Sequence, residues 1–536
     1  MSDALAIAGV LVAAGSAAAA ILLPAGRVRA AAMLLALALF PLLILGDQWH
    51  SPQIVDLRHD SARFIALGLA ALIATALLGG VFWRQPTVLP LAIVAALPFR
   101  VPLHAGGDTA NLLVPLYLVI AGGVLSAALG EWQEVGRVDP RAGFFAGRRS
   151  SLAESEGRKT GRRPQIDPPT LLPLVLAGVV VLYGVQTLYS PDFSKSLQNV
   201  CFFFVPFSLV YALLRDVRWN RELSKLVIWV VAVEAVAFVV VGSVEYLTEN
   251  LFWNDQVIRS NEFHTYFRVN SIFWDPNIYG RYLALVIVVA MAALLWVRER
   301  RALGLLTGLV AVLWLGLVPT FSQSSFAALL AGLAVLAALR WSRHWTLGVV
   351  GALAVLGVVV VVFAGGTSKI SVSRLNVDTG GRANLVSGGT DLFARRPLWG
   401  YGAGSFPRAY REHIATKKAP VSVSHTEPVT VAAEQGLVGL VAYGALLVVA
   451  LWTMAYGLRW GVLQRQLVSS PRKEPERSPQ RGLQVGDTPS RAAVLAAFVA
   501  LLVHTMAYAG FYEDPIAWVL LAAAASLATV PVRDAA

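Results

Sequence analysis

The chain has 536 residues, of which 57% are hydrophobic and only 14% are charged, and its mean hydropathy is +0.63. A soluble protein carries about 25% charged residues, so the composition excludes a soluble globular protein. The chain contains one cysteine, Cys201, which excludes an intramolecular disulfide and a cysteine-based metal site.

Apolar runs of roughly 18 residues or more recur along the chain, and each is long enough to cross a bilayer. The N-terminal sequence MSDALAIAGV lacks the basic segment of a cleaved signal peptide, so we interpret it as the first span. About fifteen spans are expected, which predicts an all-α polytopic membrane protein. They begin near residues 4, 28, 62, 86, 110, 170, 198, 225, 278, 303, 324, 345, 428, 491 and 516.

Lysine and arginine in the short loops predict an external N-terminus and a cytoplasmic C-terminus, since cytoplasmic loops carry the excess of cations. Two polar segments rich in Arg, Ser, Pro and Gly are expected to be cytoplasmic linkers. The predicted organisation is N-terminal spans 1–130, a linker 131–169, a core 170–460 with the external loop 365–427, a linker 461–490 and C-terminal spans 491–536.

The large external loop is unusually basic for its predicted side of the membrane. Its cations are Lys369, Arg374, Arg382, Arg395, Arg396, Arg408, Arg411, Lys417 and Lys418. One interpretation is attraction to anionic lipid headgroups. The other is a pocket for a phosphate-bearing substrate, because arginine binds phosphate oxygens bidentately.

Two further external segments lie earlier in the chain. Asn250–Arg281 ends in WDPNIYGR, whose Pro-Asn pair suits the start of a helix, although an ordinary interfacial loop fits as well. Pro319–Ser325 (PTFSQSS) is a polar turn whose hydroxyls can cap the next helix.

Within the large loop, Gly380–Pro407 contains Arg382 at the start of a predicted amphipathic surface helix. Arg395 and Arg396 follow, and then comes the turn GYGAG. The glycine spacing excludes a phosphate-binding P-loop, and the glycines predict a tight reversal instead.

The last segment, SHTEPVTVAAEQGLVGL, brings three titratable side chains to the mouth of an apolar helix. Glu434 follows Glu427 by about two turns, so both lie on roughly the same helix face. An acid at this depth is expected to face the bundle or a wet cavity and to pair with an arginine. His425 fits either a structural or a catalytic role.

In this order, the segments resemble the O-antigen ligase and polymerase superfamily of bacterial membrane glycosyltransferases. The resemblance covers roughly Lys225–Leu458 and includes RVNSIFWDPNIYGRYLAL, TFSQSSFAALLAG, GGR with LFARRPLWGYGAGSF, and SHTEPVTVAAEQGLVGLVAYG. The residue after His425 is commonly Asn in the family, whereas it is Thr426 here. Gln323 stands where the family often has Arg, which weakens a phosphate-binding role for the serine turn.

The resemblance implies a GT-C-like membrane fold and a donor linked to undecaprenyl diphosphate at the outer face of the cytoplasmic membrane. It also implies a metal-independent, inverting transfer of a glycan to an acceptor hydroxyl, without a cofactor. The family arginines match Arg268 and Arg382, the family histidine matches His425, and the glutamate before Gly-x-x-Gly matches Glu434.

These assignments make chemical sense for a departing diphosphate. Arg268 and Arg382 would stabilise its growing charge, with Arg395 or Arg396 as further candidates. The imidazole of His425 would accept the proton of the attacking hydroxyl or orient the acceptor. Glu427 or Glu434 would orient this imidazole or hold an arginine.

Two rival functions remain at this stage. Asp47, Asp56 and Asp60, with His50 and His59, would hold a divalent cation in a metal-dependent polyprenyl-phosphate-sugar transferase. Glu234 and His504, both inside predicted spans, would form a proton relay in a transporter or flippase of an anionic lipid or solute.

Within the preferred family, the acceptor distinguishes a ligase, a polymerase and a protein oligosaccharyltransferase. The sequence favours polysaccharide transfer over protein glycosylation. The expected partners are the lipid-linked glycan donor, a glycan or lipid acceptor and membrane lipids, and no nucleic acid is expected.

Overall fold

We analysed a computed structural model of the chain. It describes residues 3–105, 108–133, 168–263, 266–342, 382–414, 423–456 and 488–528, with the single positions 344, 346, 348 and 458. The first half contains α1 (Asp3–Leu22), α2 (Arg27–Asp47), α3 (Pro52–His59), α4 (Ser61–Arg84), α5 (Val88–Ala96), α6 (Val114–Gln133), α8 (Pro168–Thr187), α9 (Phe193–Asn199), a π-helical turn η2 (Val200–Phe204), α10 (Val205–Leu214), α11 (Arg221–Thr248) and α12 (Asp255–Phe263).

The second half contains α13 (Pro276–Trp296), α14 (Arg300–Leu317), the 3-10 turn η3 (Val318–Thr320), α15 (Gln323–Arg340), α18 (Arg382–Arg395), α19 (Phe406–His413), α20 (Glu427–Ala455), α22 (Thr488–Thr505) and α23 (Pro515–Ala528). A small antiparallel hairpin, β1 (Val101–Ala105) and β2 (Asp108–Leu112), interrupts the helices, with Val101 opposite Leu112.

The described residues contain twelve helices that are long and apolar enough to cross a membrane, which confirms a polytopic α-helical membrane protein. The expected number of about fifteen is approximate, and the described residues account for twelve of those spans. The run near residue 86 forms only the nine-residue α5 before the hairpin, and the run near residue 516 forms the fourteen-residue α23. The predicted span near residue 345, most of both linkers and parts of the external loop lie outside the described residues.

Polar residues mark the starts of the long helices, as the sequence predicts. The Asp275 side chain accepts a hydrogen bond from the Asn277 amide at 2.6 Å, and Pro276 occupies the first turn of α13. Ser322 accepts from the Ser325 amide and caps α15. Short polar segments therefore set where the apolar helices begin.

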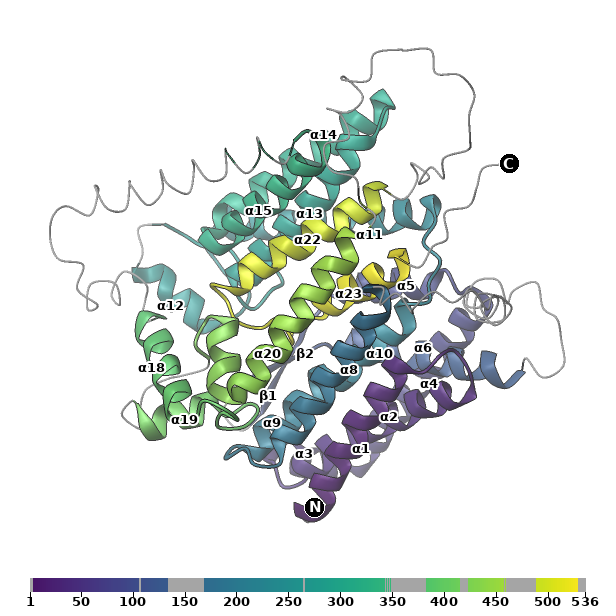
Figure 1. Ribbon diagram of the computed structural model, residues 1–536, viewed down its shortest axis with the longest axis vertical. Coiled ribbons are helices and arrows are strands. Elements are labelled where there is room, and N and C mark those ends of the chain that lie inside the picture. The colour runs from purple at the N-terminus through teal and green to yellow at the C-terminus, as the bar shows by residue number, and fades with distance from the viewer. Residues whose placement is uncertain are drawn as a thin grey trace, which may run out of the picture.

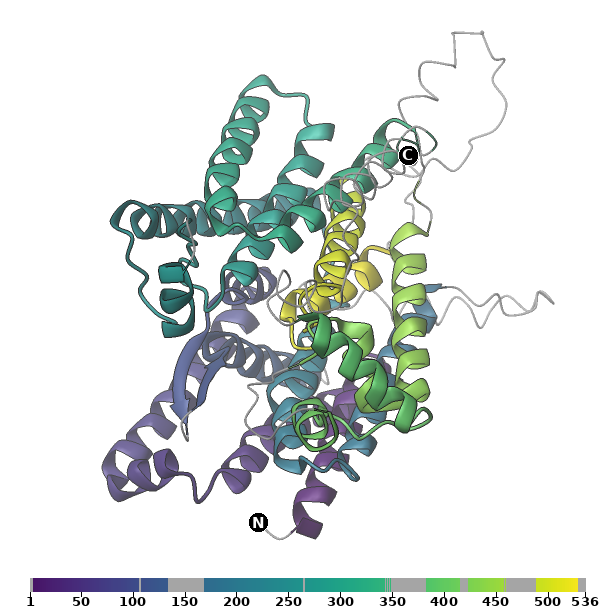
Figure 2. The same cartoon turned by 90° about the vertical axis from the view of Figure 1, so that its left-hand side faces the viewer.

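The helices form one bundle in which the C-terminal spans join the two earlier groups (Figures 1 and 2). The N-terminal group packs α1 against α2, α8 and α10, and the middle group packs α13 against α14 and α15. α20 packs against α8, α22 packs against α13 and α15, and α23 packs against α10. In Figure 1, α18 and α19 lie together at the lower left.

A break inside α20 docks the glycine-rich turn. Gly436 has φ 66° and ψ −161°, which interrupts the helical hydrogen bonds. The freed carbonyls of Ala433 and Glu434 accept from the amides of Tyr401 and Gly402 at 3.1 and 2.7 Å. Gly400 also has a positive φ of 67°, and a Cβ on it would lie 2.4 Å from the Glu434 carbonyl carbon, so this reversal requires glycine.

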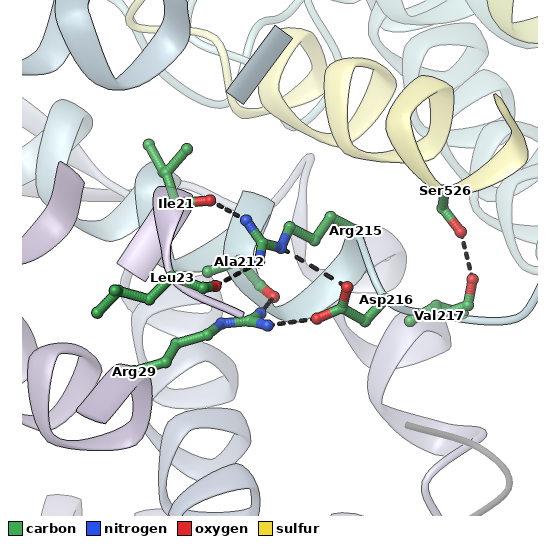
Figure 3. Close-up of polar contacts among 8 residues, drawn as sticks. All are labelled: Ile21, Leu23, Arg29, Ala212, Arg215, Asp216, Val217 and Ser526. Carbon is green, nitrogen blue, oxygen red and sulfur yellow. Dashed lines mark hydrogen bonds and ion pairs between the residues drawn. The ribbon is translucent and has the colours of Figure 1, made fainter. Parts of the chain in front are cut away.

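A cluster of polar side chains closes the end of the bundle where α1 and α10 finish (Figure 3). Arg215 donates to the carbonyls of Ile21 and Leu23, and Arg29 donates to the Ala212 carbonyl and pairs with Asp216. We call Arg29, Arg215 and Asp216 the arginine clasp. Free carbonyls at a helix C-terminus attract cations, so the clasp ties α1, α2 and α10 together.

Candidate functional site

The predicted site residues lie at the opposite end of the bundle from the arginine clasp. α11 begins six residues after Arg215, and its 28 residues span about 42 Å to the other end. There α11 and α22 finish, and α13, α15 and α20 begin. The loops that carry Arg268, Arg382 and His425 therefore meet at one end.

Arg268 lies in the loop before α13 and is held on several sides. Its Nε donates to the Thr320 carbonyl at 2.9 Å, and its Nη2 donates to Asn277 Oδ1 at 3.3 Å. The Asn261 side chain accepts from the Arg268 amide at 3.1 Å and donates to the Arg268 carbonyl at 2.9 Å. The guanidinium is thus fixed between the start of α13 and the serine turn.

The serine turn extends this network to α22. Ser322 Oγ donates to Asn277 Oδ1 at 2.9 Å, and Ser324 Oγ lies 3.2 Å from Nε2 of His504. Gly280 permits the close approach, because a Cβ there would lie 2.7 Å from Ser325 Oγ. Sequence reasoning assigned these serines mainly to capping, and the structure adds a contact with the arginine network through Asn277.

Arg382 lies close enough to Arg268 and to His425 to affect the pKa of both. Burial lowers the pKa of His425, the Arg382 guanidinium lowers it further, and Asp275 acts in the opposite direction. Burial likewise lowers the pKa of Arg268, with Asp275 opposing and Arg382 reinforcing this effect. Arg382 itself is exposed as the first residue of α18.

These groups form a site with an excess of positive charge and a neutral imidazole. Two guanidiniums face one nearby carboxylate, Asp275, whose oxygen is also engaged in capping α13. A depressed pKa favours the neutral form of His425, which is the form that accepts a proton. The arrangement suits an anion beside a base or an orienting group.

Arg395 and Arg396 do not join this cluster. They lie at the far end of the fourteen-residue α18, about 20 Å from Arg382 along the helix axis. Both are exposed, and the guanidinium of Arg396 stacks over the Tyr401 ring at 4.6 Å. Their proximity in sequence to the other loop cations was therefore a poor guide to position.

The two glutamates of α20 bind backbone amides, which corrects the expectation that Glu434 pairs with an arginine. Glu434 accepts from the amides of Gly404 at 2.8 Å and Phe406 at 3.0 Å. Glu427 accepts from the amides of Gly510 at 2.6 Å and Phe511 at 3.1 Å. Their carboxylates hold the loops around the site and make no hydrogen bond with His425.

A third carboxylate, Glu245 of α11, has the same role and was missed in the sequence. It is fully buried and accepts from the amides of Asn270 at 3.1 Å and Ser271 at 2.6 Å, just after Arg268. Ser271, Gly404 and Gly510 all have positive φ, which turns successive amides towards one anion. The sequence feature that could have identified Glu245 is an acidic residue inside an apolar span.

The carboxylates of the metal-dependent alternative have separate partners. Asp47 accepts from Ser194 Oγ at 2.8 Å, whereas Asp60 caps α4 by accepting from the Arg63 amide at 3.1 Å. Asp56 is exposed on α3, and His59 Nδ1 contacts the Val55 carbonyl at 2.8 Å. Among the described residues, no three His, Cys, Asp or Glu side chains gather closely enough to hold a metal ion.

The proposed transporter relay is also divided between two places. Glu234 accepts a hydrogen bond from Tyr282 Oη at 3.0 Å, while His504 contacts Ser324. Since each group has its own partner, the pair expected for a direct relay is not formed.

Comparison with known families places this geometry in context. A search of curated proteins found no match to the chain. The O-antigen ligase family model matches residues 308–444, which include the serine turn, Arg382, His425 and the break in α20. The match confirms the resemblance drawn from the motifs: over these residues the chain carries the O-antigen ligase domain.

Proposed function

We propose that the chain transfers a glycan from undecaprenyl diphosphate to an acceptor hydroxyl at the outer face of the cytoplasmic membrane. The observation that supports it most directly is that Arg268, Arg382 and His425 gather from three separate chain segments at one end of the bundle. The domain match supports glycosyl transfer of the ligase or polymerase kind.

In the proposed reaction the acceptor oxygen attacks the anomeric carbon from the face opposite the diphosphate, so the configuration inverts. The bond between the anomeric carbon and the diphosphate oxygen breaks, and the electron pair leaves with the diphosphate. Arg268 and Arg382 stabilise the charge that grows there. His425 takes the proton of the acceptor hydroxyl or orients this hydroxyl for attack.

The positions of the two arginines suit different tasks. Arg268 is held by Thr320 and Asn277, so its charge is preorganised at little cost when the leaving group develops. Arg382 is exposed at the start of a surface helix, where it is free to meet a substrate. Glu245, Glu427 and Glu434 act indirectly, because each holds a loop that borders the site.

The proposal is tested with purified full-length chain in liposomes that contain an undecaprenyl-diphosphate-linked glycan and a candidate acceptor. We expect release of undecaprenyl diphosphate together with an extended acceptor. His425→Ala should abolish product formation, while His59→Ala, an exposed histidine of α3, should retain it. Movement of the lipid-linked glycan without a covalent change would contradict a transferase and support a transporter.

The acceptor class is tested by deleting the gene and analysing surface glycans. Loss of long chains from a lipid core indicates a ligase, and products with a single repeat unit indicate a polymerase. Unmodified proteins outside the membrane would indicate an oligosaccharyltransferase, contrary to our preference for polysaccharide transfer.

A further inference from the structure

A second group of charged side chains lies one helical turn below the site. Arg281 of α13 pairs with Asp514 at 3.0 Å, and the two side chains are only 5% and 2% exposed. The other Asp514 oxygen accepts from the Ile516 amide at 2.9 Å and so caps α23. Buried ion pairs within membrane spans are costly, and they commonly mark a functional position.

This ion pair is continuous with the site above it. Arg281 follows Asn277 by four residues on α13 and therefore lies on the same helix face. Tyr508 lies near both groups of charged side chains. Burial raises its pKa most, Asp275 raises it further, and Arg281 and Arg100 lower it. The Tyr508 ring also lies 6.5 Å from the His425 ring.

Arg100 adds a second guanidinium to the same hollow, which opens between α5, α13 and α23. Its other lining residues include Leu97, Pro98, Phe273, Ile278 and Ile516, which are apolar. Burial lowers the pKa of Arg100, and the Asp514 carboxylate acts in the opposite direction. Within the described part of the chain, we find no hydrogen bond or ion pair formed by Arg100, so two guanidiniums share one carboxylate.

The excess of positive charge from two guanidiniums and one carboxylate favours the binding of an anion. Arginine keeps its proton in proteins, so the excess charge in an apolar setting is not relieved by deprotonation. The space between the side chains is narrow, with room for about one water-sized group. A single phosphate oxygen fits that space, and the apolar wall suits a hydrocarbon chain.

We propose that Arg100 and Arg281 form a second anion subsite, which takes a phosphate oxygen of a membrane amphiphile whose apolar chain lies against Leu97, Ile278 and Ile516. The subsite is separate from the pair Arg268 and Arg382. It gives the protein a place for a second lipid-anchored phosphate, or for the inner part of a long lipid-linked substrate.

The test measures binding of farnesyl phosphate to the full-length chain in phosphatidylcholine nanodiscs, with empty nanodiscs subtracted. The Arg382→Ala chain is the starting protein, so that the result does not depend on the function proposed above. We expect this protein to bind farnesyl phosphate, and addition of Arg100→Gln to weaken binding at least tenfold. Since Arg100 forms no hydrogen bond or ion pair within the described residues, its replacement should leave the melting temperature unchanged.

Controls separate the charge from the lipid chain. Farnesol should bind equally with and without Arg100→Gln, and Arg63→Gln, an exposed arginine at the start of α4, should not change farnesyl phosphate binding. Unchanged affinity in the Arg100→Gln protein would overturn the subsite. Competition by inorganic phosphate at the same concentration as farnesyl phosphate would overturn the assignment to a lipid and indicate a free phosphate instead.

Discussion

The two ends of the bundle use arginine in opposite ways. In the clasp, Arg29 and Arg215 are 7% and 5% exposed, and their terminal nitrogens are occupied by helix carbonyls and Asp216. At the other end Arg382 is exposed, and no hydrogen bond or ion pair of its side chain appears among the described residues. We infer that the spare hydrogen-bonding capacity of a guanidinium, and not its presence, distinguishes the proposed binding site from a structural contact.

The largest effect should come from opening the clasp. Arg215→Ala leaves the carbonyls of Ile21 and Leu23 without this donor and removes charge beside Asp216. Breaking such a buried pair costs roughly 3–5 kcal/mol, which should appear as a large fall in melting temperature in detergent. Arg218→Ala, at an exposed position three residues later, should melt like the parent. If both variants had the same melting temperature, the arginine clasp would not stabilise the bundle as we infer.

Arg382→Ala should show the converse behaviour. We expect transfer activity to fall about 100- to 1000-fold, the usual effect of removing one charge-stabilising donor, with an unchanged melting temperature. Arg395→Ala is the matched control, because it removes an exposed arginine from the other end of α18. If both variants lost activity equally, the position of Arg382 would not be what matters.

Replacing one of the carboxylates that hold the loops, Glu245, Glu427 or Glu434, should have a smaller effect than Arg215→Ala or Arg382→Ala. Glu245→Gln removes the charge from the side chain whose Oε2 accepts from both the Asn270 and Ser271 amides, and weakening these buried charge-assisted hydrogen bonds costs about 1–3 kcal/mol. Glu249→Gln, four residues later and exposed, is the control. Because Glu245 acts through the Arg268 loop, kcat should fall more than KM changes. A fall in stability with normal kcat would limit this residue to a structural role.

The pH dependence tests the electrostatics of the site. His425 must be neutral to accept a proton, and its pKa lies below 6.5, so kcat/KM should be constant above that pH and decline below it. Asp275 raises this pKa, so Asp275→Asn should move the acid limb to lower pH. Asparagine is also a good helix cap, which preserves α13. A shift to higher pH would contradict the proximity of Asp275 and His425.

The smallest effect is expected for Arg396→Gln. It removes a cation–π contact with Tyr401 at 4.6 Å, worth about 0.5–1 kcal/mol at an exposed position. Activity should stay near that of the parent in the liposome assay. A loss of activity comparable to that of Arg382→Ala would indicate that Arg396 binds the diphosphate, and the two ends of α18 would then not differ in function.

The sequence predicted the local features well because local chemistry determines them. The start of α13 at Pro276, the cap at Ser322 and the amphipathic helix after Arg382 all follow from a few adjacent residues. Hydropathy also located the long spans, although it overestimated the lengths of α5 and α23, which are apolar but short. The hairpin of β1 and β2 was not foreseen, since its surroundings read as apolar spans.

The partners of charged side chains were harder to predict. Glu434 was expected to meet an arginine and instead binds the amides of Gly404 and Phe406, which lie about thirty positions earlier in the chain. Glu245 showed the expected signal of an acid in a span, but nothing in the sequence identifies Ser271 as its partner. Such pairings depend on how loops return to the bundle.

The sequence by itself determined that the chain lies in a membrane and where most of its helices begin and end, because bilayer thickness and helix capping act over short stretches. It also determined the O-antigen ligase motifs and their order. Only the tertiary structure decided that Arg268 and Arg382 gather near His425 while Arg395 and Arg396 lie elsewhere. Packing of α11, α13, α15, α20 and α22 sets those positions, and helix packing joins residues that are distant in sequence.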